Sequence, residues 1–410
     1  MKILVFTHYF WPEEFRINDC VSTLVERGHQ VTVVAAPPSY PQGVVHPAYR
    51  ADPSKFTSYD GVRVVRIPVV TRGRGGALRL LLNYASAALS AATIGLWKLR
   101  GDRFDAILVF QPSPITTALP ALLYKSLHRV PVVMWIQDLW PDTLQAVGMV
   151  RSSWLLKCVG ALVALIYRGC DRLLIQSRAF EANVRRYVPA DAMVVYLPNW
   201  SDPGFATAAG VRPAEELQAY SETLNVMFAG NLGEAQDLPA VIEAADQTRD
   251  LPRLRWLIVG DGSARASAEA MVKLRGLEDR VIFLGRHPAD RMPSFFAAAD
   301  ALLVSLKPEP IFALTVPSKL QSYLASGRPV LSMVDGEAAR VVKEAGCGFA
   351  VPAGNSEALA RKVREFSVLS PEAREVMGHC GRAYSARVYD KGRLIGRLEE
   401  LLTEVVTDSL

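Results

Sequence analysis

The stretch Asn225–Asp237 reads NVMFAGNLGEAQD, an apolar run that ends in a turn with two glycines. A second stretch, Arg255–Ser263, repeats the arrangement as RWLIVGDGS. Short runs rich in β-branched residues, followed by glycine turns and helical segments, are typical of βαβ units with a parallel sheet. These two stretches therefore predict an α/β domain in the second half of the chain.

The same pattern occurs in both halves of the 410 residues, which is more chain than one hydrophobic core usually supports. Strands are expected at Lys2–Thr7, Gln30–Ala35, Arg63–Pro68, Ala106–Phe110, Val132–Ile136, Arg172–Gln176 and Met193–Leu197, and then at Asn225–Ala229, Arg255–Val259, Val281–Leu284, Ala301–Val304, Val330–Ser332 and Phe349–Val351. A weakly patterned segment rich in proline and glycine, residues 199–221, separates the halves. The sequence predicts two Rossmann-like doubly wound domains, residues 1–200 and 201–385, that face each other across a cleft, with a last helix in 386–410 that could cross back to the first domain.

Composition places the chain among globular proteins, because half of its residues are apolar and 21% are charged. The five cysteines show no CxxC spacing, which indicates neither a disulfide framework nor a zinc site. The N-terminus starts as a strand and shows no secretory leader, so a cytoplasmic location is expected.

Charge is unevenly distributed: residues 1–199 carry a net +9 and residues 200–410 a net −4. The stretch Leu80–Trp97 has no charged residue and is flanked by basic ones, Arg72, Arg74, Arg79, Lys98 and Arg100. It is diluted by polar residues, so it favours a helix lying at a membrane interface over one that spans the bilayer; an internal helix fits equally well. The apolar run Trp154–Tyr167 has the same ambiguity. We expect peripheral association with the inner face of the cytoplasmic membrane, and no nucleic acid partner.

The glycine turns are candidates for binding a nucleotide diphosphate. Backbone N–H groups at a glycine turn that opens a helix can hold phosphate oxygens. The candidate residues are Gly230, Asn231, Leu232, Gly233 and Gln236 in the first turn, and Gly260, Asp261 and Gly262 in the second. Glycines needed only for βα-turn geometry are the alternative, and two such turns in consecutive units favour the binding site.

Two further segments add candidate contacts. Arg286 and His287 follow the expected strand Val281–Leu284 and could present groups to a base edge. Ser318 and Lys319 would begin a helix, where a lysine beside a hydroxyl suits phosphate oxygens.

These elements, in this order and closed by Gly327-Arg328-Pro329-Val330, resemble glycosyltransferase family 4. The segments Arg27–Val33, RGHQVTV, and Leu197–Trp200, LPNW, match first-half motifs of that family. Phe10–Asp19 and Asp138–Asp142 look closest to bacterial O-antigen and capsule transferases of the WbuB type, which act on N-acetyl-fucosamine donors. The resemblance implies the GT-B fold, a nucleotide-sugar donor, no metal and no other cofactor, and retention of anomeric configuration.

The chain departs from the family pattern at the donor site. Typical members hold the phosphates with an arginine and a lysine in the first turn, and these positions are Asn231 and Gln236 here. The family's Glu-x7-Glu pair falls on Leu314 and Ser322. The expectation is that Lys319 and Arg286 replace the lost positive charge, and that Gln321 or Ser322 contacts the ribose.

Catalytic and acceptor residues are expected at the strand ends of the first half. Asp138 is the candidate base or substrate-orienting carboxylate, although it could equally cap the helix that follows. Lys319 would stabilise the departing diphosphate. His8, Glu13 and Arg16 follow the first strand and are the candidate acceptor contacts.

The sequence thus predicts a transferase that moves a sugar, such as an N-acetylamino or deoxy hexose, from a UDP-sugar to an undecaprenyl-diphosphate-linked glycan in surface polysaccharide synthesis. Two alternatives stay open. One is a UDP-sugar 2-epimerase on a similar fold, and the other is a non-catalytic protein that binds a sugar nucleotide or lipid.

Overall fold

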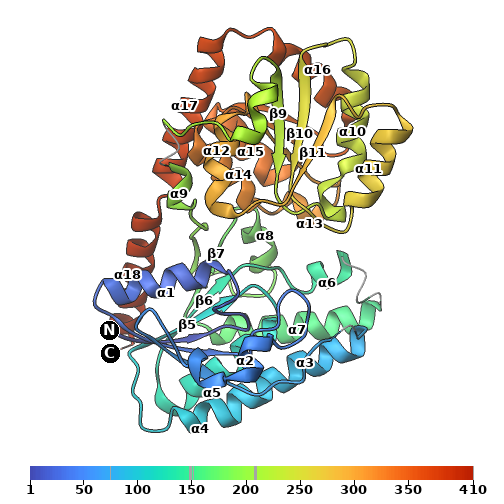
Figure 1. Cartoon of the computed structure of the whole chain (residues 1–410). Helices are drawn as coiled ribbons and strands as arrows, with labels where there is room; N and C mark the ends of the chain where they lie inside the picture. Colours follow the sequence, from blue (N-terminus) through green and yellow to red (C-terminus); the bar gives the residue numbers. More distant parts are fainter. Residues whose placement is uncertain (74, 147–149, 151, 207–209, 410) are drawn as a thin grey trace. The chain divides into compact units, whose positions relative to one another are not determined.

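The computed structural model describes residues 1–410 except 74, 147–149, 151, 207–209 and 410. It divides into two compact units: Met1–Leu197 with Gly392–Leu410, and Pro198–Lys391. Each unit is built around one parallel sheet (Figure 1).

The sheet of the first unit has the strand order β3-β4-β2-β1-β5-β6-β7-β8. Its strands are β1 (Lys2–Phe6), β2 (Gln30–Ala35), β3 (Ser58–Tyr59), β4 (Val62–Arg66), β5 (Ala106–Gln111), β6 (Val132–Ile136), β7 (Arg172–Ile175) and β8 (Val194–Tyr196). Among the described strands of this sheet, β3 alone runs antiparallel, to its neighbour β4, and it is the one that the sequence did not predict. The central strands are buried on both faces, as parallel sheets require.

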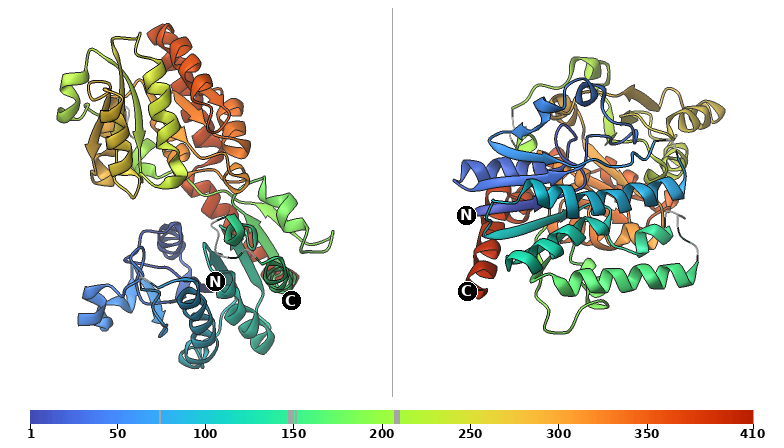
Figure 2. Two further views of the ribbon diagram at one scale, coloured as in Figure 1. Left: turned by 90° about the vertical axis from the view of Figure 1, so that its right-hand side faces the viewer. Right: turned by 90° about the horizontal axis from the view of Figure 1, so that it is seen from below.

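The helices of the first unit are α1 (Arg16–Glu26), α2 (Pro47–Ala51), α3 (Ala77–Ser90), α4 (Leu96–Lys98), α5 (Leu119–His128), α6 (Asp142–Ala146), α7 (Ser153–Gly169), α8 (Phe180–Arg185) and the C-terminal α18 (Lys391–Asp408). A π-helical turn, Ala91–Gly95, joins α3 to α4. Helix α1 covers one face of the sheet, and α3, α5 and α7 cover the other (Figures 1 and 2).

Helix α18 is attached to the first unit by ion pairs. Glu399 pairs with Arg27, and its other oxygen lies 2.7 Å from His29 Nε2. Farther along, Glu404 pairs with the buried guanidinium of Arg172. These pairs join α18 to β7 and to the residues that follow α1. The C-terminal helix of the chain therefore belongs to the same unit as residues Met1–Leu197.

The second unit has the strand order β11-β10-β9-β12-β13-β14, and every pair is parallel. Its strands are β9 (Leu224–Ala229), β10 (Leu254–Val259), β11 (Val281–Gly285), β12 (Ala301–Ser305), β13 (Val330–Met333) and β14 (Gly348–Val351). Its helices are α9 (Pro203–Ala206), α10 (Leu238–Gln247), α11 (Arg265–Leu274), α12 (Met292–Ala297), α13 (Pro310–Ala313), α14 (Ser318–Ser326), α15 (Gly336–Ala345), α16 (Ser356–Ser367) and α17 (Pro371–Val388).

Alternate side chains of the central strands enter two hydrophobic cores, one on each face of this sheet. Phe228 and Trp256 lie in the core with α10, α11 and α16, whereas Met227 and Leu257 lie in the core with α14 and α15. Burial on both faces fixes the strand register, because a shift of one residue would exchange the two sets.

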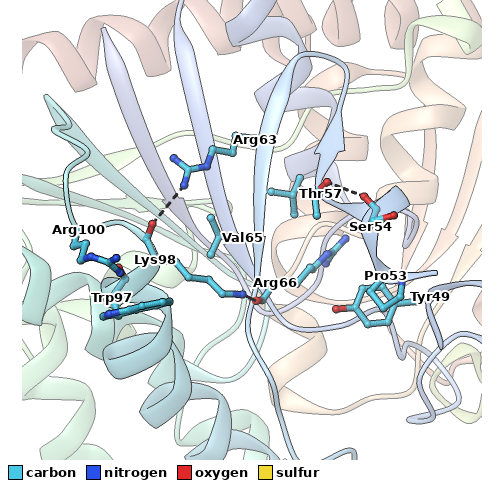
Figure 3. A pocket seen from close by; sticks show the side chains of 11 residues that line it. Tyr49, Pro53, Ser54, Thr57, Arg63, Val65, Arg66, Trp97, Lys98 and Arg100 are labelled. Carbon is cyan, nitrogen blue, oxygen red and sulfur yellow. Dashed lines mark hydrogen bonds between the residues drawn. The ribbon is translucent and has the colours of Figure 1, made fainter. Parts of the chain in front are cut away.

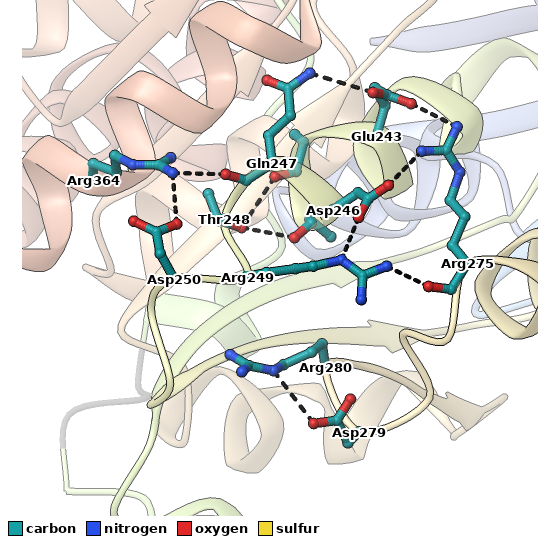
Figure 4. A network of polar contacts seen from close by, with 12 residues as sticks. Glu243, Asp246, Gln247, Thr248, Arg249, Asp250, Arg275, Asp279, Arg280 and Arg364 are labelled. Carbon is teal, nitrogen blue, oxygen red and sulfur yellow. Dashed lines mark hydrogen bonds and ion pairs between the residues drawn. The ribbon is translucent and has the colours of Figure 1, made fainter.

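A network of charged side chains ties the ends of α10, α11 and α16 together (Figure 4). Arg275 pairs with Asp246 at 2.7 Å and with Glu243 at 2.6 Å, and Arg364 pairs with Asp250 at 2.6 Å. These residues lie in the last turns of α10 and α16 or just after α10 and α11, and therefore near the amino ends of the strands. The network is structural, since ligands of open α/β sheets bind at the opposite, carboxyl ends.

Candidate functional site

The carboxyl ends of β9, β10 and β11 form a row of linked glycine turns. Gly230 N donates to Val259 O at 2.9 Å, and Gly260 N donates to Gly285 O at 2.7 Å. The first two turns are also joined two residues farther on, where Leu232 N donates to Asp261 O at 2.9 Å. The structure therefore brings both predicted glycine turns to one edge of the sheet, beside the strand that precedes Arg286.

Gly260 and Gly262 are explained by close packing of the two turns. A Cβ on Gly260 would lie 1.9 Å from Gly230 O, and its φ of +137° is a conformation that glycine alone adopts readily. A Cβ on Gly262 would lie 2.5 Å from Leu232 O. Close packing of the two turns alone therefore explains why these two positions are glycines. That either glycine contacts a ligand remains a prediction.

The first glycine turn is followed by two separate helices. A 3₁₀ helix of three residues, Glu234–Gln236, follows Gly233, and α10 starts only at Leu238. Asp237 separates the two because it has the left-handed φ of +51°, which cannot continue a right-handed helix. The turn therefore opens a helix as expected, but that helix is a short 3₁₀ turn, and α10 begins as a separate helix after Asp237.

Lys319, in the first turn of α14, reaches into this row of turns. Its ammonium donates to Gln236 Oε1 and lies 3.7 Å from the centroid of the Phe228 ring. A Cβ on Gly230 would be 3.3 Å from Lys319 Nζ, so the absence of a side chain at Gly230 provides space for the ammonium. The structure thus places Lys319 beside Gln236, the position where the resembling family has a lysine.

No ion pair joins Lys319 to a carboxylate in the described part of the chain, and burial lowers the pKa of its ammonium to about 7. The nearby Lys307 differs, because its ammonium pairs with Glu234 Oε2 at 3.1 Å. An ammonium without a counter-charge at the carboxyl edge of a sheet is suited to a ligand that brings its own negative charge.

Tyr323, which sequence reasoning did not select, holds the first turn against α14. Its hydroxyl accepts from Ala229 N at 2.8 Å and donates to Ala229 O at 3.0 Å, immediately before Gly230. Phe228, the aromatic ring under the Lys319 ammonium, was missed as well. In the sequence, both look like ordinary core residues. The only signal for Phe228 was its position near the end of a strand, and the only signal for Tyr323 was its position one helical turn after Lys319.

The other residues predicted to bind the sugar-nucleotide donor lie around this edge. They differ in whether their side chains are exposed or held by contacts within the protein. Arg286 is exposed after β11, whereas His287 Nε2 is 2.9 Å from Leu284 O and its ring packs on Phe295. Asp261 Oδ1 accepts from Gly262 N at 2.8 Å, and Asn231 lies over Gly233, whose added Cβ would be 2.8 Å from Asn231 Nδ2.

The two predicted ribose contacts differ in where they point. Gln321 is buried and donates to Asn199 O at 2.8 Å, so its amide is turned toward the interdomain segment. Ser322 is half-buried on the same helix as the exposed Ser318. The structure therefore favours Ser322 over Gln321 among the candidates.

In the first unit, His8 is buried and Asp138 is half-buried, after the carboxyl ends of β1 and β6. Burial lowers the pKa of His8 to about 4, so the imidazole is neutral near pH 7, and the ring packs edge-on against Tyr84. Burial also raises the pKa of Asp138, while a hydrogen bond of 2.6 Å from Thr143 Oγ1 opposes that shift. Asp138 thus holds the first turn of α6 with one oxygen, and its contact with substrate remains a prediction.

Glu13 and Arg16 occupy the loop after β1 and the start of α1. Glu13 Oε1 accepts from the backbone amides of Ser39 and Tyr40, both at 2.6 Å, and Oε2 accepts from Phe10 N at 3.1 Å. The carboxylate therefore fastens two loops together. Arg16 lies 3.8 Å from Asp19 at the protein surface. The acceptor contacts expected of both residues remain predictions.

Models of glycosyltransferase domains match both units of the chain. A model described as "Glycosyl transferase 4-like domain" matches residues 14–200, and one described as "Glycosyl transferases group 1" matches residues 214–383. The putative colanic acid biosynthesis glycosyl transferase WcaI of Escherichia coli K12 is 29% identical over 96% of this chain and 98% of its own. The probable glycosyltransferase WbjE of Pseudomonas aeruginosa is 28% identical over 66% of this chain and 68% of its own.

Solved structures share the architecture. HepE from Anabaena, in complex with UDP, superposes with a TM-score of 0.71 at 17% identity, over 98% of this chain and all of that one. WaaG, a glycosyltransferase involved in lipopolysaccharide biosynthesis, superposes with a TM-score of 0.66 at 16% identity over the same shares. These likenesses, with the two parallel α/β sheets, confirm the predicted GT-B fold.

Proposed function

Since this chain is a glycosyltransferase of group 1, we propose that it transfers a sugar from a UDP-sugar to a lipid-diphosphate-linked glycan during the synthesis of a bacterial surface polysaccharide. The observation that carries the donor assignment is Lys319, whose ammonium lies beside the glycine turns of the second unit and has no carboxylate partner among the described residues. A diphosphate is the group that would satisfy it, because phosphate oxygens accept strong hydrogen bonds from ammonium groups.

UDP as the nucleotide is supported by the related structure of HepE, which was solved with UDP. Surface polysaccharide synthesis is supported by the relative WcaI, whose description names colanic acid. As the sugar we propose an N-acetylamino or deoxy hexose such as N-acetyl-fucosamine, on the resemblance of Phe10–Asp19 and Asp138–Asp142 to WbuB-type transferases. Residues 201–385 would bind this donor, and residues 1–200 would bind the acceptor at the inner face of the cytoplasmic membrane.

In the proposed reaction, the acceptor hydroxyl oxygen bonds to the anomeric carbon of the sugar as the bond from that carbon to the diphosphate breaks. Negative charge develops on the departing UDP, and the Lys319 ammonium stabilises it without a metal. With retention of configuration, the hydroxyl proton passes to the leaving phosphate. His8, neutral near pH 7, and Asp138 would then orient the acceptor or the sugar through hydrogen bonds.

The test is incubation of the protein with a panel of UDP-sugars and a lipid extract that contains undecaprenyl-diphosphate glycans. We expect release of UDP together with transfer of the sugar to the lipid fraction. Conversion of the UDP-sugar to its 2-epimer without transfer would indicate the epimerase alternative. Binding of UDP without consumption of any UDP-sugar would indicate the non-catalytic alternative.

A further inference from the structure

The helical segment Leu78–Lys98 exposes six of its large apolar side chains, whereas its fully buried positions hold small or polar residues. The buried positions are Asn83, Ala87, Ser90, Ala91 and Gly95. The exposed side chains range from 39% exposed for Ile94 to 72% for Leu78, and comprise Leu78, Leu81, Leu82, Leu89, Ile94 and Trp97. A helix on the surface of a water-soluble domain normally has the opposite arrangement, since burial of its apolar stripe is what holds it to the core.

This segment is also long and apolar enough to cross a membrane by length and composition, and 28% of its most apolar 18 residues are buried. The buried side is packed onto its own unit: a Cβ on Gly95 would lie 3.4 Å from Ile67 and 3.6 Å from Val34. Because one side of the helix is held by the sheet, the exposed side is available to a bilayer only if the helix lies along the bilayer surface.

Two neighbouring helices extend the exposed apolar surface. Helix α5 contacts both α3 and α7, and the three lie side by side on one face of the sheet (Figure 2, right). The additional exposed apolar side chains are Leu123 and Leu127 on α5, and Trp154, Leu155 and Leu165 on α7. We call the exposed side of α3 to α4, α5 and α7 the three-helix face.

The charges on the three-helix face have a single sign. No aspartate or glutamate occurs in Leu78–Arg100, Leu119–Arg129 or Ser152–Arg168. The exposed charged residues of these segments are Arg79, Lys98, Arg100, Arg129, Lys157 and Arg168. Arg74, which was expected to flank the apolar segment, lies outside the described residues.

We propose that the three-helix face docks the protein onto an anionic membrane surface, with its apolar side chains in the interfacial layer and its basic side chains among lipid phosphates. Leucine and tryptophan side chains next to lysine and arginine are the combination that holds a helix at such an interface. A second copy of the chain fits less well, because two such faces would bring basic side chains together. The inference rests on the proposed function in that it names the surface that would hold the enzyme at its lipid-linked acceptor.

A basic hollow of about 750 Å³ opens at the Trp97 end of the three-helix face (Figure 3). Arg63, Arg66, Lys98 and Arg100 line it. The Arg100 guanidinium stacks on the Trp97 ring, 4.2 Å from its centroid. Among the residues that the structure describes, Arg63 alone of these four forms an ion pair, with Asp102 at 2.8 Å. The hollow adds positive charge where lipid phosphates would meet the end of the helix.

The test is co-sedimentation of the purified full chain with vesicles of phosphatidylcholine alone or of phosphatidylcholine mixed with phosphatidylglycerol. We expect binding to the anionic vesicles that falls as salt is added. The variant Leu82→Glu/Leu89→Glu should bind at least about tenfold more weakly, and Lys157→Glu should reduce the preference for anionic vesicles. The matched control is Leu274→Glu on α11 of the second unit, where the leucine is 87% exposed, and it should bind like the unchanged protein.

Calorimetric binding of UDP in solution separates this inference from the donor assignment, because it needs no membrane and should be the same in all of these variants. UDP binding that persists in Leu82→Glu/Leu89→Glu also shows that the variant is folded. Equal binding of that variant and the unchanged protein to anionic vesicles would overturn the inference. So would a lipid-free dimer that Leu89→Glu dissociates, since a second copy would then cover the face.

Discussion

Replacement of Lys319 by methionine should weaken UDP binding while leaving the protein at least as stable. Methionine has a similar length and no charge, so Lys319→Met removes the ammonium beside Gln236 and Gly230 with little change in packing. A hydrogen bond from a charged group to a phosphate contributes about 1.5–3 kcal/mol, which corresponds to roughly a tenfold to hundredfold rise in Kd. Isothermal calorimetry with UDP near pH 6.5 measures this change directly.

The stability expectation follows from the pKa of the same group. Burial lowers the pKa of Lys319 from 10.5 to about 7, so the unfolded chain holds this proton more tightly than the folded one. The burial penalty on the ammonium is therefore fully present below pH 7 and declines as pH rises from about 7 toward 10.5. Lys319→Met should raise the melting temperature, and the increase should be larger at pH 6 than at pH 9.

The matched control is Lys307→Met, which removes another ammonium near the same turn. Lys307 is already paired with Glu234, and its loss should change the Kd for UDP by no more than about fivefold, in the range of an exposed ion pair. Unchanged UDP binding in Lys319→Met, or equal weakening in both variants, would refute the assignment of Lys319 to the diphosphate.

Four further outcomes are expected. Affinity for UDP should fall as pH rises through about 7, where the Lys319 ammonium loses its proton, and a calorimetric pH series should show no such fall in Lys319→Met. Gly260→Ala should destabilise the protein in urea unfolding by on the order of 3 kcal/mol or more because its Cβ would overlap Gly230 O, whereas Gly276→Ala, with open space around it, should cost about 1–2 kcal/mol. Tyr323→Phe should cost about 1–3 kcal/mol in the same assay, because it leaves the buried Ala229 groups without the hydroxyl. Asp138→Asn should lower the transfer rate and leave the Kd for UDP unchanged; equal loss of both would contradict a role confined to the first unit.

The sheets could be predicted from sequence because buried parallel strands are short apolar runs, which need no knowledge of distant partners. The short β3 was missed since two residues, Ser58 and Tyr59, carry no periodic signal. The break between the 3₁₀ helix and α10 was not predicted, because the left-handed conformation of Asp237 depends on its surroundings and cannot be recognised in the residue pattern.

The donor site could be predicted in part. Lys319 was recognisable from its place at a helix start, and its proximity to Gln236 could be inferred only through the family pattern. The contact between Gln321 and Asn199 spans 122 positions in sequence, so no local pattern predicts that this amide donates to the Asn199 carbonyl. The Tyr323 clamp on Ala229 likewise joins residues 94 positions apart.

The most direct test of the account is an experimental structure of the protein with bound UDP. We expect the diphosphate at the carboxyl edge of β9 and β10, with a phosphate oxygen within hydrogen-bond distance of Lys319 Nζ and of the backbone amides of the turn that begins at Gly230. A diphosphate bound elsewhere, with Lys319 still hydrogen-bonded only to Gln236, would contradict the assignment of this edge as the donor site.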